Sequence, residues 1–157
     1  MMIRRLALLL SIALAAPAAA QDFVPADSAL IANHALTEAE IGRVVALAER
    51  ADSVFRAAPD AFAGIHSKED GPYTIDGIAV RYGSNAAFRA ELERAGITAR
   101  EFVLTMAAIV SALRASMEES ERRDALPPVE AANLRLVQAL DEPITRMFAT
   151  LRRVIPG

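Results

Sequence analysis

The stretch ITAREFVLTMAAIVSALRAS, residues 97–116, is the most apolar part of the chain beyond its first 20 residues. Residues 102–113 within it carry no charge, and Arg100, Glu101 and Arg114 bracket them. A membrane-spanning helix needs about 20 apolar residues, so this run of 12 is too short to cross a bilayer. A helix that is apolar on all sides and this short is typical of the buried centre of a fold. The stretch therefore predicts a central helix with the other helices packed around it.

Capping signals mark the start of this helix and of an earlier one. Thr98 and Glu101 form the pattern T-x-x-E, and so do Thr37 and Glu40. In this pattern the hydroxyl and the carboxylate each accept a hydrogen bond from a backbone N–H group that the first helical turn leaves unpaired. Pro59 ends the earlier helix, because the residue before a proline avoids the α conformation. We therefore expect two long helices that begin directly after the two threonines.

Two further helices complete the expected fold. A short one ends at Gly96, and a long one runs from Val129 to about Ile155. Pro143 lies inside the long one and predicts a kink or a break near residues 141–142. The chain has the size of one ordinary domain. We therefore expect an all-α protein, a small bundle of four or five helices around the buried central one.

Residues 64–83 do not follow the helical pattern. They hold four of the seven glycines, and their weak alternation of apolar and polar side chains favours an irregular loop or a small hairpin that turns at Asp76-Gly77. A long loop on a rigid scaffold is often a binding site, although an insertion without a role is the alternative. The candidate binding residues are the polar side chains that folding does not require: His66, Glu69, Asp70, Tyr73, Asp76, Arg81 and Tyr82.

Residue types and missing motifs exclude several classes of function. The chain has no cysteine, which removes disulfides, thiolate metal sites and cysteine nucleophiles. The motifs of phosphate-binding loops, serine hydrolases, zinc proteases and dinucleotide sites are absent from the sequence. A net charge of −3 argues against binding to nucleic acid, since affinity for phosphate backbones needs clustered cations.

The two histidines are the remaining candidates for metal binding or acid–base catalysis. His34 and Glu38 are four residues apart, but Thr37 as the N-cap places His34 outside the helix. His66 lies in a denser polar cluster within residues 64–83. Zinc usually requires four ligands, and ordinary packing or surface roles explain both histidines. We therefore expect no metal site and no cofactor.

Methionine and phenylalanine side chains supply a possible apolar pocket. Met106, Met117 and Met147 lie at helical positions with Phe102 and Phe148. Methionine adapts to irregular surfaces, so these side chains either line a pocket or fill gaps in the core. We favour the second interpretation.

The first 20 residues have the layout of a secretory signal peptide. Two arginines precede an apolar run over residues 6–16, and residues 18–20 are alanines suited to cleavage before Gln21. An uncleaved membrane anchor is the alternative. Cleavage would leave one helical domain, residues 21–157, in the periplasm or outside the cell and without a membrane span. Because cleavage removes two of the 17 basic residues and none of the 20 acidic ones, the net charge falls from −3 to −5.

Two segments of the chain are similar to segments of small exported all-helical proteins of uncharacterised function from Gram-negative bacteria. They are GITAREFVLTMAAIVSALRAS at residues 96–116 and PPVEAANLRLVQAL at residues 127–140. The matching positions are Gly96, Ile97, Thr98, Glu101 and Phe102, followed by Asn133, Leu136 and Val137. The resemblance implies export and an all-helical fold, and it implies no activity and no site residue.

Three classes of function remain open at this stage. A binding or accessory module of the cell envelope, which contacts another envelope protein or a small apolar ligand, fits the missing catalytic motifs best. A small enzyme would use carboxylates and His66 within residues 64–83. A purely structural envelope protein would have no small ligand.

The signal peptide leads to a direct test. We expect protein exported to the periplasm to begin at Gln21, because the alanines before it suit signal peptidase. The intact mass of the exported protein measures this. A mass that still includes residues 1–20 would contradict cleavage and would indicate an anchored protein.

Overall fold

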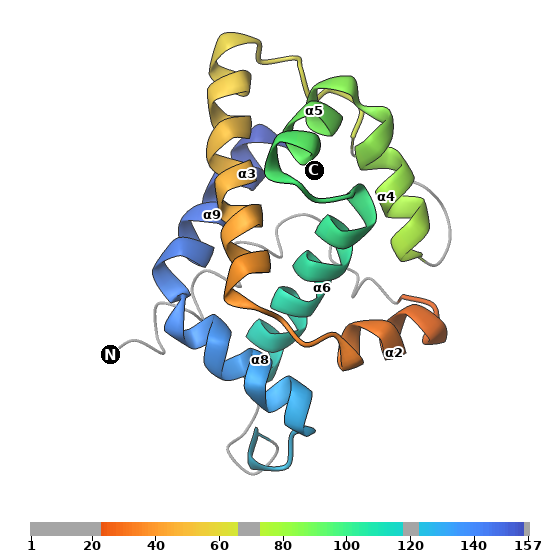
Figure 1. The fold of residues 1–157 in the computed structure, drawn as a ribbon, viewed down its shortest axis with the longest axis vertical. Coiled ribbons are helices and arrows are strands. Elements are labelled where there is room, and N and C mark those ends of the chain that lie inside the picture. The colour runs from red at the N-terminus through yellow and green to blue at the C-terminus, as the bar shows by residue number, and fades with distance from the viewer. Residues whose placement is uncertain (1–22, 66–72, 118–122, 156–157) are drawn as a thin grey trace.

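The computed structural model describes residues 23–65, 73–117 and 123–155, and within these ranges it contains seven α-helices and no β-strand (Figure 1). The all-α class is therefore confirmed. The expected signal peptide lies outside the described residues. The helices are α2 (Pro25–Asn33), α3 (Glu38–Ala57), α4 (Ile75–Ser84), α5 (Ala86–Ala95), α6 (Ala99–Ala115), α8 (Pro128–Ala139) and α9 (Asp141–Val154).

The helix α6 occupies the centre of the fold, as its apolar sequence predicts. It contacts α2, α3, α4, α5 and α8, which surround it in Figure 1. Every residue from 102 to 113 is buried or half-buried, and Ile109 is fully buried. Burying apolar surface contributes about 25 cal/mol per Å², so this helix is a main source of folding free energy.

Both capping boxes are present. At the start of α6, the backbone N–H of Thr98 donates to the Glu101 carboxylate at 2.7 Å, and the N–H of Glu101 donates to the Thr98 hydroxyl at 3.1 Å. Thr37 and Glu40 form the same pair of hydrogen bonds at the start of α3. The two predicted helix starts are therefore confirmed.

An aromatic cluster joins α4, α5 and α6 at one end of the fold. The ring of Phe88 packs against Tyr82 and Phe102 with centroid distances of 4.9 and 5.3 Å, and the edge of Phe62 approaches it at 5.9 Å. Such tilted and edge-to-face pairs add to the free energy of burial. The cluster therefore holds α4 against α6.

The helix α4 replaces the loop or hairpin predicted for residues 64–83, and that prediction is wrong for the second half of the segment. The Thr74 hydroxyl accepts a hydrogen bond from the N–H of Gly77 at 2.9 Å. The Asp27 carboxylate, on α2, accepts one from the N–H of Ile75 at 2.8 Å. Two N–H groups that the first helical turn leaves unpaired therefore have acceptors, and α4 begins where a hairpin was expected.

The segment predicted as one long final helix is broken into α8 and α9. Leu140 between them has φ −106° and ψ 25°, outside the helical range. Pro143 is the third residue of α9. Proline lacks a backbone N–H, but the N–H groups of the first helical turn have no carbonyl acceptor within the helix, so no hydrogen bond is lost here. The predicted break near residues 141–142 is confirmed. With this break and with α2 and α4, the described residues contain seven helices rather than four or five.

Asn133 holds the connection between α2 and α3 against α8. Its side-chain oxygen accepts from the N–H of Leu36 at 2.9 Å, and its side-chain nitrogen donates to the carbonyl of His34 at 2.8 Å. Asn133 is buried, and a buried amide of this kind is costly to leave unpaired. The asparagine therefore acts as a cross-link between segments that lie almost 100 residues apart in the chain.

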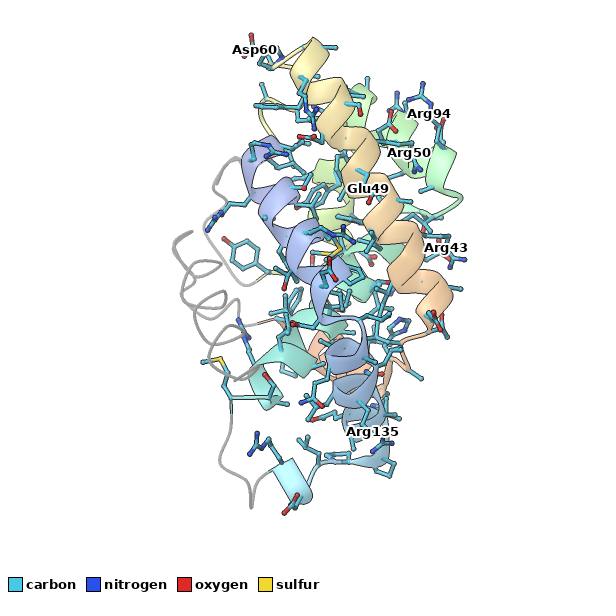
Figure 2. The ribbon with its side chains drawn as sticks, turned by 90° about the vertical axis from the view of Figure 1, so that its left-hand side faces the viewer. Arg43, Glu49, Arg50, Asp60, Arg94 and Arg135 are labelled. Atoms are coloured by element: carbon cyan, nitrogen blue, oxygen red, sulfur yellow. The ribbon has the colours of Figure 1, made fainter. Side chains whose placement is uncertain are left out.

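Two buried carboxylates, each held by two arginines, fix α3 to its neighbours. Asp52 on α3 binds Arg56 of the same helix and Arg153 of α9. Glu91 on α5 binds Arg94 of its own helix, and Arg50 of α3 donates to it at 3.2 Å. Figure 2 shows Arg50 and Arg94 on these neighbouring helices. The hydrogen bond from Arg56, with further bonds and charge from Arg153, holds the pKa of Asp52 below its ordinary value of 3.8 against an opposing effect of burial.

The central position of α6 predicts the relative cost of two substitutions. Thr98→Ala removes a helix cap and should destabilise the protein by about 1 kcal/mol. Ile109→Ala removes a fully buried side chain and leaves a cavity, which should cost about 2–5 kcal/mol. Chemical denaturation measures both, and a larger loss for Thr98→Ala would contradict the central role of α6.

The lowered pKa of Asp52 predicts how stability depends on pH. Because folding lowers this pKa, the unfolded chain takes up the proton first as the pH falls. The contribution of Asp52 is therefore complete above pH 3.8 and is lost as the pH falls through the lower pKa of the folded state. Asp52→Asn should have a lower free energy of unfolding than the wild type at neutral pH, and this difference should disappear in acid.

The exposed Asp60 provides the control variant, Asp60→Asn, whose free energy of unfolding should differ little from that of the wild type at every pH. If the difference in free energy of unfolding between Asp52→Asn and the wild type stays constant from neutral to acid pH, the charge of Asp52 does not stabilise the fold.

Candidate functional site

The predicted binding residues are divided between described and undescribed parts of the chain. His66, Glu69 and Asp70 lie outside the described residues. Tyr73 directly precedes the N-cap of α4, and the remaining three candidates lie on α4 itself. The helix disperses them around its axis instead of gathering them in one loop.

Of these four side chains, the structure brings two together. The guanidinium carbon of Arg81 lies 5.6 Å from the centre of the Tyr73 ring, a cation–π contact. Asp76 is exposed and accepts a hydrogen bond from the Nε of Arg100 at 2.8 Å. Tyr82 belongs to the aromatic cluster. These contacts with other described residues account for Tyr73, Asp76 and Tyr82 as parts of the fold.

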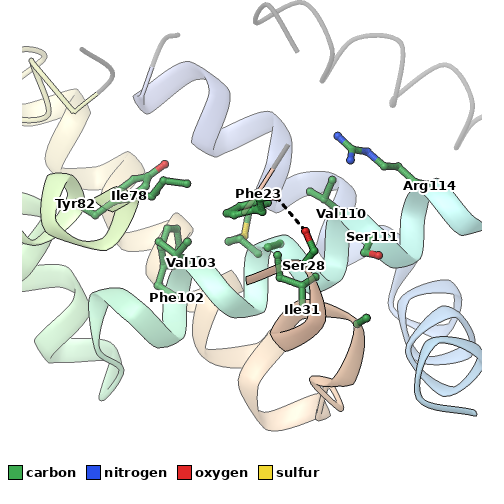
Figure 3. A pocket seen from close by; sticks show the side chains of 13 residues that line it. Phe23, Ser28, Ile31, Ile78, Tyr82, Phe102, Val103, Val110, Ser111 and Arg114 are labelled. Atoms are coloured by element: carbon green, nitrogen blue, oxygen red, sulfur yellow. Dashed lines mark hydrogen bonds between the residues drawn. The ribbon is translucent and has the colours of Figure 1, made fainter. Parts of the chain in front are cut away.

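A groove between α2, α4 and α6 is the best candidate site among the described residues. Its volume is about 440 Å³, and Figure 3 shows it from close by. Ligand pockets usually enclose about 300–1,000 Å³ and are mostly apolar with a few polar groups. The lining residues are Phe23, Ser28, Ile31, Ala32, Ile78, Tyr82, Phe102, Val103, Met106, Ala107, Val110, Ser111 and Arg114.

The floor of the groove is one stripe of α6. It runs from Val103 to Arg114, with lining residues three or four positions apart, and such residues share a helix face. At a rise of 1.5 Å per residue the stripe is about 16 Å long. The small side chains of Ala107 and Ser111 lie on this face. They leave space where larger residues would close the gap between α6 and α2.

Polar groups are few along the groove and lie mainly at its ends. The Ser28 hydroxyl donates to the carbonyl of Phe23 at 3.2 Å. Figure 3 shows Tyr82 at one end, and Ser111 and Arg114 at the other. Burial raises the pKa of the Tyr82 hydroxyl above its ordinary value of 10.0, against a smaller opposing effect of the Arg81 charge. Tyr82 therefore stays uncharged at neutral pH.

Arg114 carries the only formal charge among the described residues that line the groove. It lies in the last turn of α6 and is exposed. None of the hydrogen bonds or ion pairs between described residues involves its guanidinium. The groove therefore combines a long apolar wall with one cation that is open to a ligand.

The groove lacks the parts of acid–base catalysis. Its described lining contains no histidine, cysteine, aspartate or glutamate. Elsewhere in the described ranges, no group of three such residues is placed to hold a metal ion. His34 Nε2 lies 3.3 Å from a carboxylate oxygen of Glu40, which is a local contact at the start of α3.

Sequence reasoning identified part of this groove without locating it. Met106 and Phe102, considered as possible pocket residues, do line it. Met147 is buried in the core and Met117 is exposed, so the remaining methionines do not contribute. Small side chains alone do not locate the groove, because Ala108 and Ala112 have the same spacing as Ala107 and Ser111 on this helix and are buried.

Comparison of the chain with family models, curated proteins and solved structures finds no significant match. The assignment of a function therefore depends on the geometry of the described residues.

Among the described helices, none is by itself long and apolar enough to cross a membrane. Helices α5 and α6 together reach the required length and composition, but they are bent by 79° at the break between them.

Proposed function

We propose that this chain is an exported, non-catalytic binding module of the cell envelope and that the groove along α6 binds a small apolar ligand. The observation that carries the proposal is the open apolar groove on the central helix. Among the described residues, five helices contact α6, and this stripe of the helix has a cavity beside it. The groove has a volume in the range of ligand pockets, and most of its described lining residues are apolar.

The alternative of a structural protein without a ligand explains the groove less well. Each Å² of apolar surface left uncovered forgoes about 25 cal/mol of stabilisation. Two larger side chains in place of Ala107 and Ser111 would fill the space. A ligand that covers the same apolar surface would recover this free energy on binding, which would explain why the groove is open.

The alternative of a small enzyme receives no support from the described carboxylates. A general acid needs a raised pKa, whereas the pKa of buried Asp52 is lowered by its two arginines. Glu91 is likewise held by two arginines. The catalytic proposal depended on His66, Glu69 and Asp70, which lie outside the described residues.

Export remains a proposal that rests on the sequence of residues 1–20 and on the similarity to small exported helical proteins. The cell envelope is rich in apolar molecules that need a carrier in water, and a protein with one open apolar groove suits that compartment. Another envelope protein is the second possible partner. It would bind to the apolar surface of the same groove.

The proposed groove can be closed with one substitution. Ala107→Phe places a ring in the middle of the stripe and should weaken binding of the neutral fluorescent probe N-phenyl-1-naphthylamine at least about tenfold, since the ring occupies the space of the ligand. The matched control is Ala149→Phe on α9, where the side chain is exposed and outside the groove. Fluorescence titration measures the dissociation constants, and unfolding curves establish that both variants fold.

Equal binding by the wild type and Ala107→Phe would contradict the proposal. No binding of the probe to the folded wild type would also contradict it, and would leave the structural alternative as the better account.

A further inference from the structure

We infer that the ligand is a single-chain carboxylate anion, bound with its carboxylate at Arg114 and its hydrocarbon chain along α6 toward Tyr82. This inference rests on the proposed function, because it names the ligand class for the same groove. Charge complementarity is the observation that selects an anion. Of the described residues that line the groove, Arg114 alone is charged, and it lies at one end of the groove.

The polar end of the groove fits a carboxylate. Ser111 lies one helical turn before Arg114, so its hydroxyl and the guanidinium lie on the same face of α6. A guanidinium donates two parallel hydrogen bonds to a carboxylate, and charge-assisted bonds of this kind are about twice as strong as neutral ones. The guanidinium balances one negative charge and the hydroxyl can donate one more hydrogen bond, which suits a carboxylate better than a doubly charged phosphate.

The remainder of the groove fits one hydrocarbon chain. The stripe of α6 extends about 16 Å from Arg114 to Val103, long enough for an extended medium-length chain. The volume of about 440 Å³ lies in the lower part of the usual range for ligand pockets, which favours one chain over the two of a diacyl lipid. Ile78, Phe102 and the uncharged Tyr82 close the far end with apolar surface.

The position of Arg114 on its helix sharpens the inference. It lies in the last turn of α6, where the helix dipole places partial negative charge on the backbone carbonyl groups. These carbonyls attract a cation and repel an anion. The Arg114 guanidinium offsets this repulsion for a bound carboxylate, and removal of Arg114 should reverse the preference for an anion rather than only weaken it.

The test compares ligands with one chain and different head groups. Dodecanoate, dodecanol and dodecyl phosphate, each below its aggregation concentration, compete against N-phenyl-1-naphthylamine on the full chain. Dodecanoate should displace the probe from the wild type at a concentration about fivefold lower than dodecanol, since an accessible ion pair contributes roughly that factor.

Three variants separate the charge of Arg114 from its effect on folding. In Arg114→Gln, dodecanoate should bind more weakly than dodecanol. Arg114→Lys should retain a preference for dodecanoate. Arg135→Gln, at an exposed position on α8 outside the groove, should match the wild type for every ligand.

The outcomes distinguish this inference from the proposed function. Equal displacement by dodecanol and dodecanoate, or an unchanged preference in Arg114→Gln, would overturn the assignment of a carboxylate and leave the apolar groove intact. Stronger displacement by dodecyl phosphate than by dodecanoate would overturn it in favour of a phosphate head group. If none of the ligands displaces the probe, or if Ala107→Phe binds all of them like the wild type, the groove is not the site and the proposed function fails with the inference.

Discussion

The constraint on which the fold depends is that residues 102–113 of α6 carry no charged side chain to turn toward water. A run of 12 uncharged residues has to be covered on all sides, and helices from both ends of the chain supply the cover. Helices α4 and α5 reach it through the aromatic cluster around Phe88, and α2 and α8 cover its other faces. The groove is the one stripe that this cover leaves open among the described residues, and its floor consists of the same apolar helix.

Polar contacts determine how the helices that surround α6 are oriented. Apolar packing is not directional, whereas the hydrogen bonds of Asn133 and the arginine pairs at Asp52 and Glu91 each require one geometry. Asp52 connects α3 to α9, and Glu91 connects α5 to α3. Replacing a buried ion pair with apolar residues can be neutral for stability, so we attribute to these pairs the alignment of the helices more than their stability.

Local signals predicted those parts of the fold that depend on neighbouring residues. The two capping boxes, the break before Pro143 and the burial of residues 102–113 each follow from a few adjacent side chains. The start of α4 is only partly local, because Thr74 caps the helix but the Asp27 carboxylate that accepts from Ile75 comes from 48 residues earlier. Asp76-Gly77 also matches a hairpin turn when read alone.

The candidate site was hard to predict for the same reason. A groove is a relation between helices, and the sequence of α6 alone does not show that α2 and α4 leave its face open. The polar residues of α4 were predicted to bind a ligand because folding did not require them in the expected loop. In the structure Asp76 pairs with Arg100 and Arg81 lies over Tyr73, so contacts within the fold account for both.

Solution NMR of the chain with dodecanol bound tests the central claim most directly, because it locates the hydrocarbon chain without a substitution. The account predicts nuclear Overhauser effects between the chain of the ligand and the methyl groups of Ile31, Ile78 and Val110, which line the groove. The buried methyl groups of Ile144 and Val154 on α9 should show none. Contacts confined to α9 or to any other surface, with the groove methyl groups unaffected, would contradict the assignment of the groove along α6 as the binding site.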